Sequence, residues 1–255
     1  MKRTYVLFLV VVLAVLFIFS STGKMQDMKV KPYVQRTKAP AALKPDLDFG
    51  KIPLYFITNK GQVNAEAKFY ANASRYTLWL TKEGLLFDSF KRAEIDMTHP
   101  APTGHPSQEG NAGYLRDVSR LMFIGADKNA EIEAVEKVDL KVNYIKGNDK
   151  SKWHAAPTAM EVQYKSLYKN IDLKVYGIEK QIEYDWIVKP GANPADIRFE
   201  YKNVKGTRID KEGNLLIETS FGELMHKKPV SFQEIENEKT AVKADFKKLG
   251  KNTYG

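Results

Sequence analysis

From residue 52 onward, apolar residues recur in short alternating runs and in no sustained helical period of 11 residues or more. The clearest run spans residues 181–188, where Ile182, Tyr184, Trp186 and Val188 occupy every second position. Because successive side chains of a strand point to opposite faces, these four residues share one face. We expect that face, including Trp186, to pack in a core while the polar residues between them lie on the other face.

Further short runs end at glycine, proline, asparagine or aspartate, the residues that turns favour. The predicted strands cover residues 54–57, 78–80, 85–87, 121–124, 141–145, 181–188, 197–201, 215–219, 230–235 and 241–249. Residues 129–138 are expected to hold one or two helical turns. Regularly spaced strands with hairpin turns predict a mostly β fold, either an antiparallel β-sandwich or open barrel-like sheets.

The N-terminal 23 residues have the pattern of an export segment. Lys2 and Arg3 precede an uncharged run at residues 4–23, which ends in small residues. This pattern predicts a signal peptide cleaved before Lys24. As a helix the same run is also long enough to remain as a membrane anchor. In either case we expect an N-terminal hydrophobic helix and an exported chain, located in the periplasm, on the cell surface or outside the cell.

The net charge of +9 is unevenly distributed along the chain. Residues 1–23 carry +2, residues 24–51 carry +4, and only +3 remains for residues 52–255. Residues 24–51 contain three prolines and no apolar period, so we interpret them as a basic Pro/Lys linker. Together with the export segment they could contact anionic lipid headgroups. The alternative, which we favour, is a solvated tether. The nearly balanced remainder, with scattered lysines, argues against nucleic-acid binding.

Residues 52–255 are expected to form one β-rich domain. Residues 99–113 are rich in proline, glycine and serine, which predicts a mobile loop between strands rather than a domain boundary. The chain contains no cysteine, which excludes disulfides, thiol nucleophiles and cysteine-ligated zinc. A domain of this size can rely on its apolar core without disulfides.

Three carboxylates are the candidate metal ligands. Glu183 and Asp185 occupy alternate positions of a predicted strand and therefore share a face, and Asp172 lies on a neighbouring strand. Their oxygens could bind a cation such as calcium or serve as an acid/base pair. The competing interpretation is that they form the polar face of an amphipathic strand. No cofactor is expected.

The candidate ligand-binding residues are Asn59, Gln62 and Trp153. Asn59 and Gln62 belong to a polar cluster after the predicted strand at residues 54–57, where turn formation is the alternative role. Trp153 follows a turn and is the aromatic residue best placed to be exposed. Exposed aromatic rings on an exported β-sandwich suggest glycan binding by analogy of fold.

No catalytic residues are predicted. The four histidines, His99, His105, His154 and His226, have no zinc-like spacing, and we expect them on the surface. The sequence also lacks the GxSxG elbow of many serine hydrolases. The chain is therefore not expected to be an enzyme, and a metal-dependent hydrolase is the most distant of the functions considered.

Several phrases within residues 53–254 resemble the N-terminal uncharacterised domain of bacterial SBBP-repeat (β-propeller repeat) proteins. They are residues 56–63, 142–149 with Trp153, 168–173, 182–186 leading into 190–194, and then Asp210, Gly213, Leu215, Pro229 and Gln233. The resemblance implies an exported or surface-exposed protein and supplies no catalytic residues. It also implies a further C-terminal strand, followed by the propeller repeats. This chain instead stops at residues 252–255, where we expect a turn.

The combined pattern predicts a structural or interaction module of the bacterial envelope. A missing last strand is expected to leave an exposed sheet edge, through which copies of the chain can associate. Its expected partners are an envelope protein or a surface glycan, and a glycan-binding envelope protein is the alternative function.

Overall fold

The computed structural model describes residues 6–11, 54–73, 76–92, 114–178, 181–235 and 238–255. The predicted linker at residues 24–51 and the predicted loop at residues 99–113 lie outside these ranges. Two short 3-10 turns, Lys150–Lys152 and Pro194–Asp196, are the helical elements of the described ranges. The remaining regular structure is β, so the mostly β prediction is confirmed.

The strands of the first half are β1 (Val6–Val11), β2 (Phe56–Thr58), β3 (Ala67–Asn72), β4 (Tyr76–Thr81), β5 (Gly84–Arg92), β6 (Tyr114–Phe123), β7 (Glu131–Tyr144) and β8 (His154–Tyr168). Those of the second half are β9 (Ile171–Ile178), β10 (Gln181–Val188), β11 (Phe199–Lys202), β12 (Gly206–Ile209), β13 (Leu215–Thr219), β14 (Gly222–His226), β15 (Val230–Ile235), β16 (Glu238–Val242) and β17 (Thr253–Tyr254).

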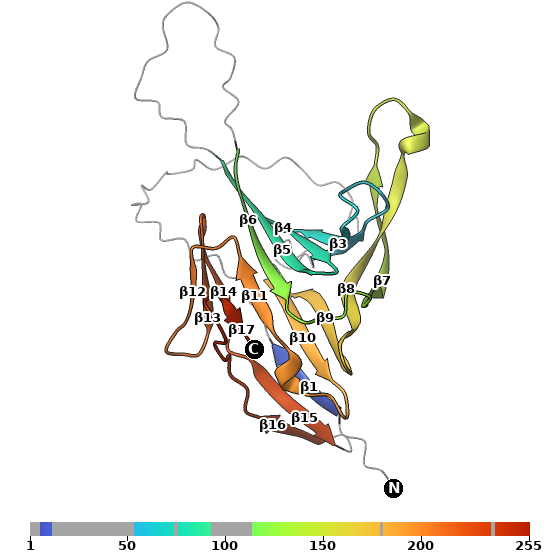
Figure 1. The fold of residues 1–255 in the computed structure, drawn as a ribbon. Coiled ribbons are helices and arrows are strands. Elements are labelled where there is room, and N and C mark those ends of the chain that lie inside the picture. Colours follow the sequence, from blue (N-terminus) through green and yellow to red (C-terminus); the bar gives the residue numbers. More distant parts are fainter. Residues whose placement is uncertain (1–5, 12–53, 74–75, 93–113, 179–180, 236–237) are drawn as a thin grey trace, which may run out of the picture.

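Fourteen of these strands form one sheet, in the order β16-β15-β1-β10-β9-β8-β2-β3-β4-β5-β6-β11-β17, with β7 also paired to β8. The other three strands form a small sheet, β12-β13-β14. All described pairs are antiparallel. The long sheet curls into a half-barrel (Figure 1), which is the open, barrel-like form among those predicted.

Strands β10, β13 and β15 coincide with their predicted ranges. The helical turns predicted at residues 129–138 are wrong, because most of this segment belongs to the long strand β7. Tertiary pairing decides its conformation, since β7 pairs with β8 along its length. The strand predicted at residues 241–249 ends at Val242, and the chain continues without regular structure to an isolated bridge at Lys248.

Strands β7 and β8 form a long hairpin, at the right of Figure 1. Pro157 of β8 has no N–H to donate, and the register of β7 shifts opposite it, between Val138 and Lys141. The Thr158 hydroxyl donates a hydrogen bond of 2.6 Å to the Leu140 carbonyl within this irregularity. The strand therefore accommodates its proline at a bulge.

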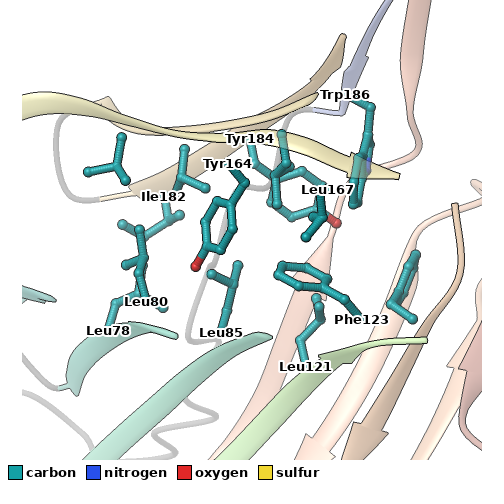
Figure 2. Packing of buried hydrophobic residues seen from close by; sticks show 14 of the residues in the cluster. Leu78, Leu80, Leu85, Leu121, Phe123, Tyr164, Leu167, Ile182, Tyr184 and Trp186 are labelled. Carbon is teal, nitrogen blue, oxygen red and sulfur yellow. The ribbon is translucent and has the colours of Figure 1, made fainter. Parts of the chain in front are cut away.

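The main core lies between two parts of the curled sheet (Figure 2). One part contributes Leu78, Leu80, Leu85, Leu121 and Phe123 from strands β4, β5 and β6. Facing them are Tyr164, Leu167, Ile182, Tyr184 and Trp186 from strands β8 and β10. The predicted core face of residues 181–188 is confirmed, since Ile182, Tyr184, Trp186 and Val188 are all at most 3% exposed.

The N-terminal helix is not confirmed. Of residues 1–23 the structure describes only β1, and it places this segment as a strand between β10 and β15. Its sequence, VLFLVV, is rich in the β-branched and apolar residues that strands favour. Among the residues that the structure describes, no helix is long and apolar enough to cross a membrane.

The C-terminal residues do not end in a turn as expected. Thr253 and Tyr254 form β17, which pairs with β11. The Tyr254 side chain is fully buried, stacks on Phe199 and donates a hydrogen bond of 2.8 Å to the Thr207 hydroxyl. These contacts join the end of the chain to both sheets.

One glycine position tests the close pairing of β5 and β6. A Cβ atom added at Gly84 would lie 2.0 Å from the Leu121 carbonyl oxygen, whereas one added at Gly206 meets no atom within 4 Å. We therefore expect Gly84→Ala to lower the free energy of unfolding by about 2 kcal/mol or more through overpacking. Gly206→Ala is the matched control and should change stability by less than about 0.5 kcal/mol. Equal denaturation midpoints for the two variants in urea would contradict this expectation.

Candidate functional site

The three candidate metal ligands lie on the same side of β9 and β10, opposite the core. Asp185 pairs with Lys174 and Asp172 pairs with Ile187, so the register places Asp172 one pair further along this face. Glu183 is only 9% exposed although it lies on the face opposite the core. The structure therefore places all three carboxylates on one face, as the alternation of residues indicated.

Asp172 is already surrounded by donors. One of its carboxylate oxygens accepts hydrogen bonds from Lys189 Nζ at 2.6 Å and Gln163 Nε2 at 2.9 Å. The other accepts from the Ser166 backbone N–H at 2.8 Å. In the described ranges no group of three or more His, Cys, Asp or Glu side chains is arranged to hold a metal ion. A metal role for Asp172, Glu183 and Asp185 therefore stays a prediction, and the donors around Asp172 point to a structural role.

Asp185 lies in a poorly solvated part of the same face. Burial is the main reason that its pKa rises to about 6, while a hydrogen bond from the Tyr176 hydroxyl at 3.1 Å acts in the opposite direction. Burial and the neighbouring Asp185 carboxylate in turn raise the pKa of Tyr176. The face thus holds a carboxyl group that can titrate near neutral pH.

Asn59 and Gln62 organise their own loop. The Asn59 amide nitrogen donates to the carbonyls of Asn64 and Ala67 at 2.9 and 2.8 Å, and its oxygen accepts from Gly61 N–H at 2.9 Å. Gln62 donates to the Thr58 carbonyl at 2.8 Å and accepts from Lys60 N–H at 2.7 Å. These bonds agree with the turn-forming role, and ligand binding by either residue stays a prediction.

Trp153 is 37% exposed beyond the 3-10 turn of the β7–β8 hairpin, as the sequence suggested. Its indole nitrogen donates to the Gly147 carbonyl at 3.2 Å. The neighbouring aromatic rings pack among themselves, with Tyr144 stacked on His154 and Tyr70 stacked on Trp79. The Tyr70 and Tyr144 hydroxyl groups also hydrogen-bond to each other. Trp153 is therefore a single exposed ring beside a packed aromatic cluster.

The expectation of surface histidines is wrong for His226. This residue ends β14 and is fully buried, with its ring hydrogen-bonded to the hydroxyls of Tyr201 and Tyr184. Burial lowers the pKa of His226 to about 3, so the ring is neutral at pH 7. His154 is half-buried, and His99 and His105 lie outside the described residues. The curled sheet, which brings β14 against β10 and β11, buries a residue type that is usually exposed.

A groove of about 720 Å³ with several charged side chains, which no sequence pattern had indicated, is formed by three separate loops. The first loop follows β6 and contributes Gly125 and Asp127. The second consists of the irregular end of β8 and the turn into β9, and it contributes Ser166 and residues 168–170. The third surrounds the turn Pro194–Asp196 and contributes Asp196 and Arg198. Loops that converge on a rigid sheet are a common position for binding sites.

The backbone that lines this groove is locally strained. Ser166 and Asn170 are two of the three non-glycine residues with positive φ in the described chain, at 49° and 58°. Such conformations cost of order 1–3 kcal/mol and persist only where their surroundings enforce them. The Asp172 carboxylate holds Ser166 N–H, and the Asn170 carbonyl accepts from Lys189 N–H at 2.9 Å. The asparagine at position 170 was the one sequence signal of a left-handed turn here.

Further hydrogen bonds link the three loops of the groove to one another. Asp127 N–H donates to the Leu167 carbonyl at 2.8 Å, and Ile124 N–H donates to the Arg198 carbonyl at 2.9 Å. The same Arg198 carbonyl accepts from the Tyr168 hydroxyl at 2.6 Å. The groove is therefore preorganised, with two carboxylates, one lysine, one guanidinium and one amide at its rim.

His226 and Asp185 make opposite contributions to the pH dependence of stability. The pKa of His226 falls from 6.5 to about 3 on folding, so its stabilising effect is complete above pH 6.5 and is lost as the pH falls towards 3. The pKa of Asp185 rises from 3.8 to about 6, so the cost of burying its charge is complete above pH 6 and disappears as the pH falls towards 4. The two effects oppose each other between pH 4 and 6.

Single substitutions should separate these effects. In Asp185→Asn, unfolding free energy should fall more steeply between pH 6 and 4 than in the wild type, approaching the slope of about 1.4 kcal/mol per pH unit for one proton. Adding His226→Gln should flatten that slope, because no buried imidazole then remains to be protonated. Urea denaturation at pH 4, 5, 6 and 7 measures both. Parallel profiles for the single and double variants would show that His226 does not control this range.

Comparison with known proteins gives a family but no described function. Residues 56–255 match the family described as a domain of unknown function (DUF7948). No curated protein and no solved structure matches the chain. The match covers every described strand of both sheets except β1, and it contains every residue of the groove. The chain therefore belongs to the DUF7948 family, whose domain spans residues 56–255.

Proposed function

We propose that this chain is an exported module of the bacterial envelope that binds a partner through the three-loop groove and performs no catalysis. Export is supported by the basic start and the apolar run at residues 4–23, which are typical of a signal peptide or anchor. Residues 1–51 then bring the domain close to a membrane. The association with SBBP repeats, suggested by sequence phrases, belongs to the same proposal.

The preorganised groove is the observation that carries the binding function. Its loops come from three distant parts of the sequence and are tied together by backbone hydrogen bonds, so a ligand need not order them. Burial raises the pKa of Tyr168 to about 12, which makes this lining residue a poor acid or base at neutral pH. The other strongly displaced pKa values described above belong to the core or to the face of β9 and β10. This distribution favours binding over catalysis.

A surface glycan is the second candidate, and the groove chemistry favours it specifically. Carboxylates (Asp127, Asp196), an amide (Asn170) and a guanidinium (Arg198) are planar polar groups that can each hydrogen-bond to sugar hydroxyls. The equal number of acidic and basic groups, two of each, suits a neutral or zwitterionic ligand. An envelope protein remains the partner expected for the first function, and a metal-dependent hydrolase is the most distant proposal.

Cell fractionation tests export. The full chain should be recovered outside the cytoplasm and should be degraded by protease added to cells whose outer layer has been permeabilised. A variant lacking residues 1–23 should stay in the cytoplasm and resist the same treatment, because it lacks the apolar segment. Equal cytoplasmic retention of both chains would contradict export while leaving the groove untested, so binding is measured separately.

Binding to purified cell-wall and exopolysaccharide preparations tests the groove. Lys169→Ala combined with Arg198→Ala removes both cationic groups at the rim and should weaken binding at least about tenfold, since each charged hydrogen bond contributes roughly 1.5–3 kcal/mol. The matched control is Lys146→Ala with Lys150→Ala on the distant hairpin, which should bind like the wild type. Binding to sugars supports the glycan function, and binding only to envelope protein fractions supports the first. Equal binding by both double variants would exclude the groove.

A further inference from the structure

Strand β1 occupies a slot in the sheet that the rest of the domain leaves open. It pairs antiparallel with β10 on one side and with β15 on the other, through five residue pairs each. No described pairing joins β10 directly to β15, so the β15–β16 hairpin is held in the sheet only through β1. Without β1, both strands present unpaired backbone N–H and C=O groups across a gap one strand wide.

The strand that fills this slot does not belong to the family domain. The DUF7948 match begins at residue 56, whereas β1 spans Val6–Val11 within the export-like segment. A segment that acts as a signal peptide or membrane anchor cannot remain in the sheet at the same time. Under the proposed export β1 is withdrawn, and the place between β10 and β15 is left to another strand.

The two walls of the slot specify what else can enter it. Tyr184, Trp186 and Val188 of β10 face the core beside the slot, and each is at most 3% exposed. On the other wall, Ser231 of β15 is 4% exposed and pairs with the same β1 residue, Leu9, that pairs with Trp186. The place opposite Trp186 and Ser231 is therefore enclosed on both sides, and an apolar residue suits it best.

A cavity of about 330 Å³ lies against the inner side of the slot. It is lined mainly by apolar side chains, among them Tyr184, Trp186, Ile197, Phe199 and Phe246, together with Ser231 from the second wall. We number the positions of an entering strand by the β1 residues that they replace, so position 9 is the place of Leu9. Trp186 and Ser231 flank position 9, and a large apolar side chain there is therefore the one best placed to fill the cavity.

The next register position faces away from the core and adds a charge requirement. Position 10 pairs with Asp185 of β10 and Val230 of β15. On the β9 side the Asp185 carboxylate has the Tyr176 hydroxyl as a hydrogen-bond partner and Lys174 as its paired residue, whereas the paired position on the slot side carries a valine. A lysine or arginine at position 10 of an entering strand would pair with this carboxylate.

We infer that the gap between β10 and β15 is a strand-acceptor site for a partner protein. The partner supplies a strand of about six residues, antiparallel to both walls, with a large apolar residue opposite Trp186 followed by a basic residue opposite Asp185. Backbone hydrogen bonds to both walls provide affinity, and the two adjacent positions provide specificity. The inference rests on the proposed export only for the step that withdraws β1.

Purified full-length chain tests the site without depending on export. Leu9→Pro places a residue without an N–H in the centre of β1 and should empty the slot. Leu16→Pro, in the same apolar run but outside β1, is the matched control. The probe is a lysine-flanked synthetic peptide, Val-Leu-Phe-Phe-Lys-Val, which carries the two predicted residues at positions 9 and 10. A version with proline at position 9 is the peptide control.

The peptide should raise the melting temperature of the Leu9→Pro chain by roughly 5–10 °C at about 100 times its Kd. It should leave the wild type and Leu16→Pro unchanged, because β1 fills their slot. The unmodified sequence VLFLVV should bind at least tenfold more weakly. If Leu9→Pro is unfolded, the peptide should restore its β circular dichroism, and failure to do so overturns the inference.

Disulfide trapping identifies the site, since the chain contains no cysteine of its own. A peptide with cysteine at position 8 should cross-link to Ile187→Cys of β10 in the Leu9→Pro background, because these positions pair. It should not cross-link to Glu218→Cys of the three-stranded sheet. The inference is overturned if the peptide labels Ile187→Cys and Glu218→Cys equally. It is also overturned if the proline peptide binds as tightly as the probe peptide, or if the Leu9→Pro chain forms a dimer that excludes the peptide.

Discussion

The structure depends on apolar packing across the inside of one curled sheet. Leucine and phenylalanine side chains from β4, β5 and β6 meet tyrosine, leucine and tryptophan side chains from β8 and β10. Each half of the sheet supplies the surface that the other half needs to bury, so neither can form its core alone. The hydrogen-bonded strand ladder then keeps the two halves in register, and the loops at the ends of these strands take their positions from it.

The groove and the strand slot are both consequences of this curled sheet, and they differ in how they are completed. Three loops form the groove, and hydrogen bonds between their backbones hold it in shape. The slot needs a strand, because β10 and β15 each leave one edge unpaired without β1. The two proposals therefore assign chemically different partners to two separate places on the same domain.

The polar residues around β9 and β10 show why the sequence pattern predicted only part of the site. Alternation along residues 181–188 correctly placed Glu183 and Asp185 on one face, because face assignment is a local property of a strand. It could not show that Lys189, Gln163 and the Ser166 backbone surround Asp172. Spacing also placed His226 on the surface, whereas Tyr184 and Tyr201, from other strands, enclose it. Such contacts depend on which strands become neighbours.

The amino-acid sequence by itself determined the β class, the bounds of β10, β13 and β15, the core face of β10 and the turn-forming residues around Asn59. Each of these follows from spacing or from preferences within a few residues. Only the tertiary structure decided that residues 129–138 extend into a strand, that the long sheet curls into a half-barrel, and that Gly125, Asn170 and Arg198 line one groove. It also placed the apolar N-terminal run between β10 and β15. These outcomes bring together residues far apart in sequence, and their free energy comes from burial and hydrogen bonding that no single segment contains.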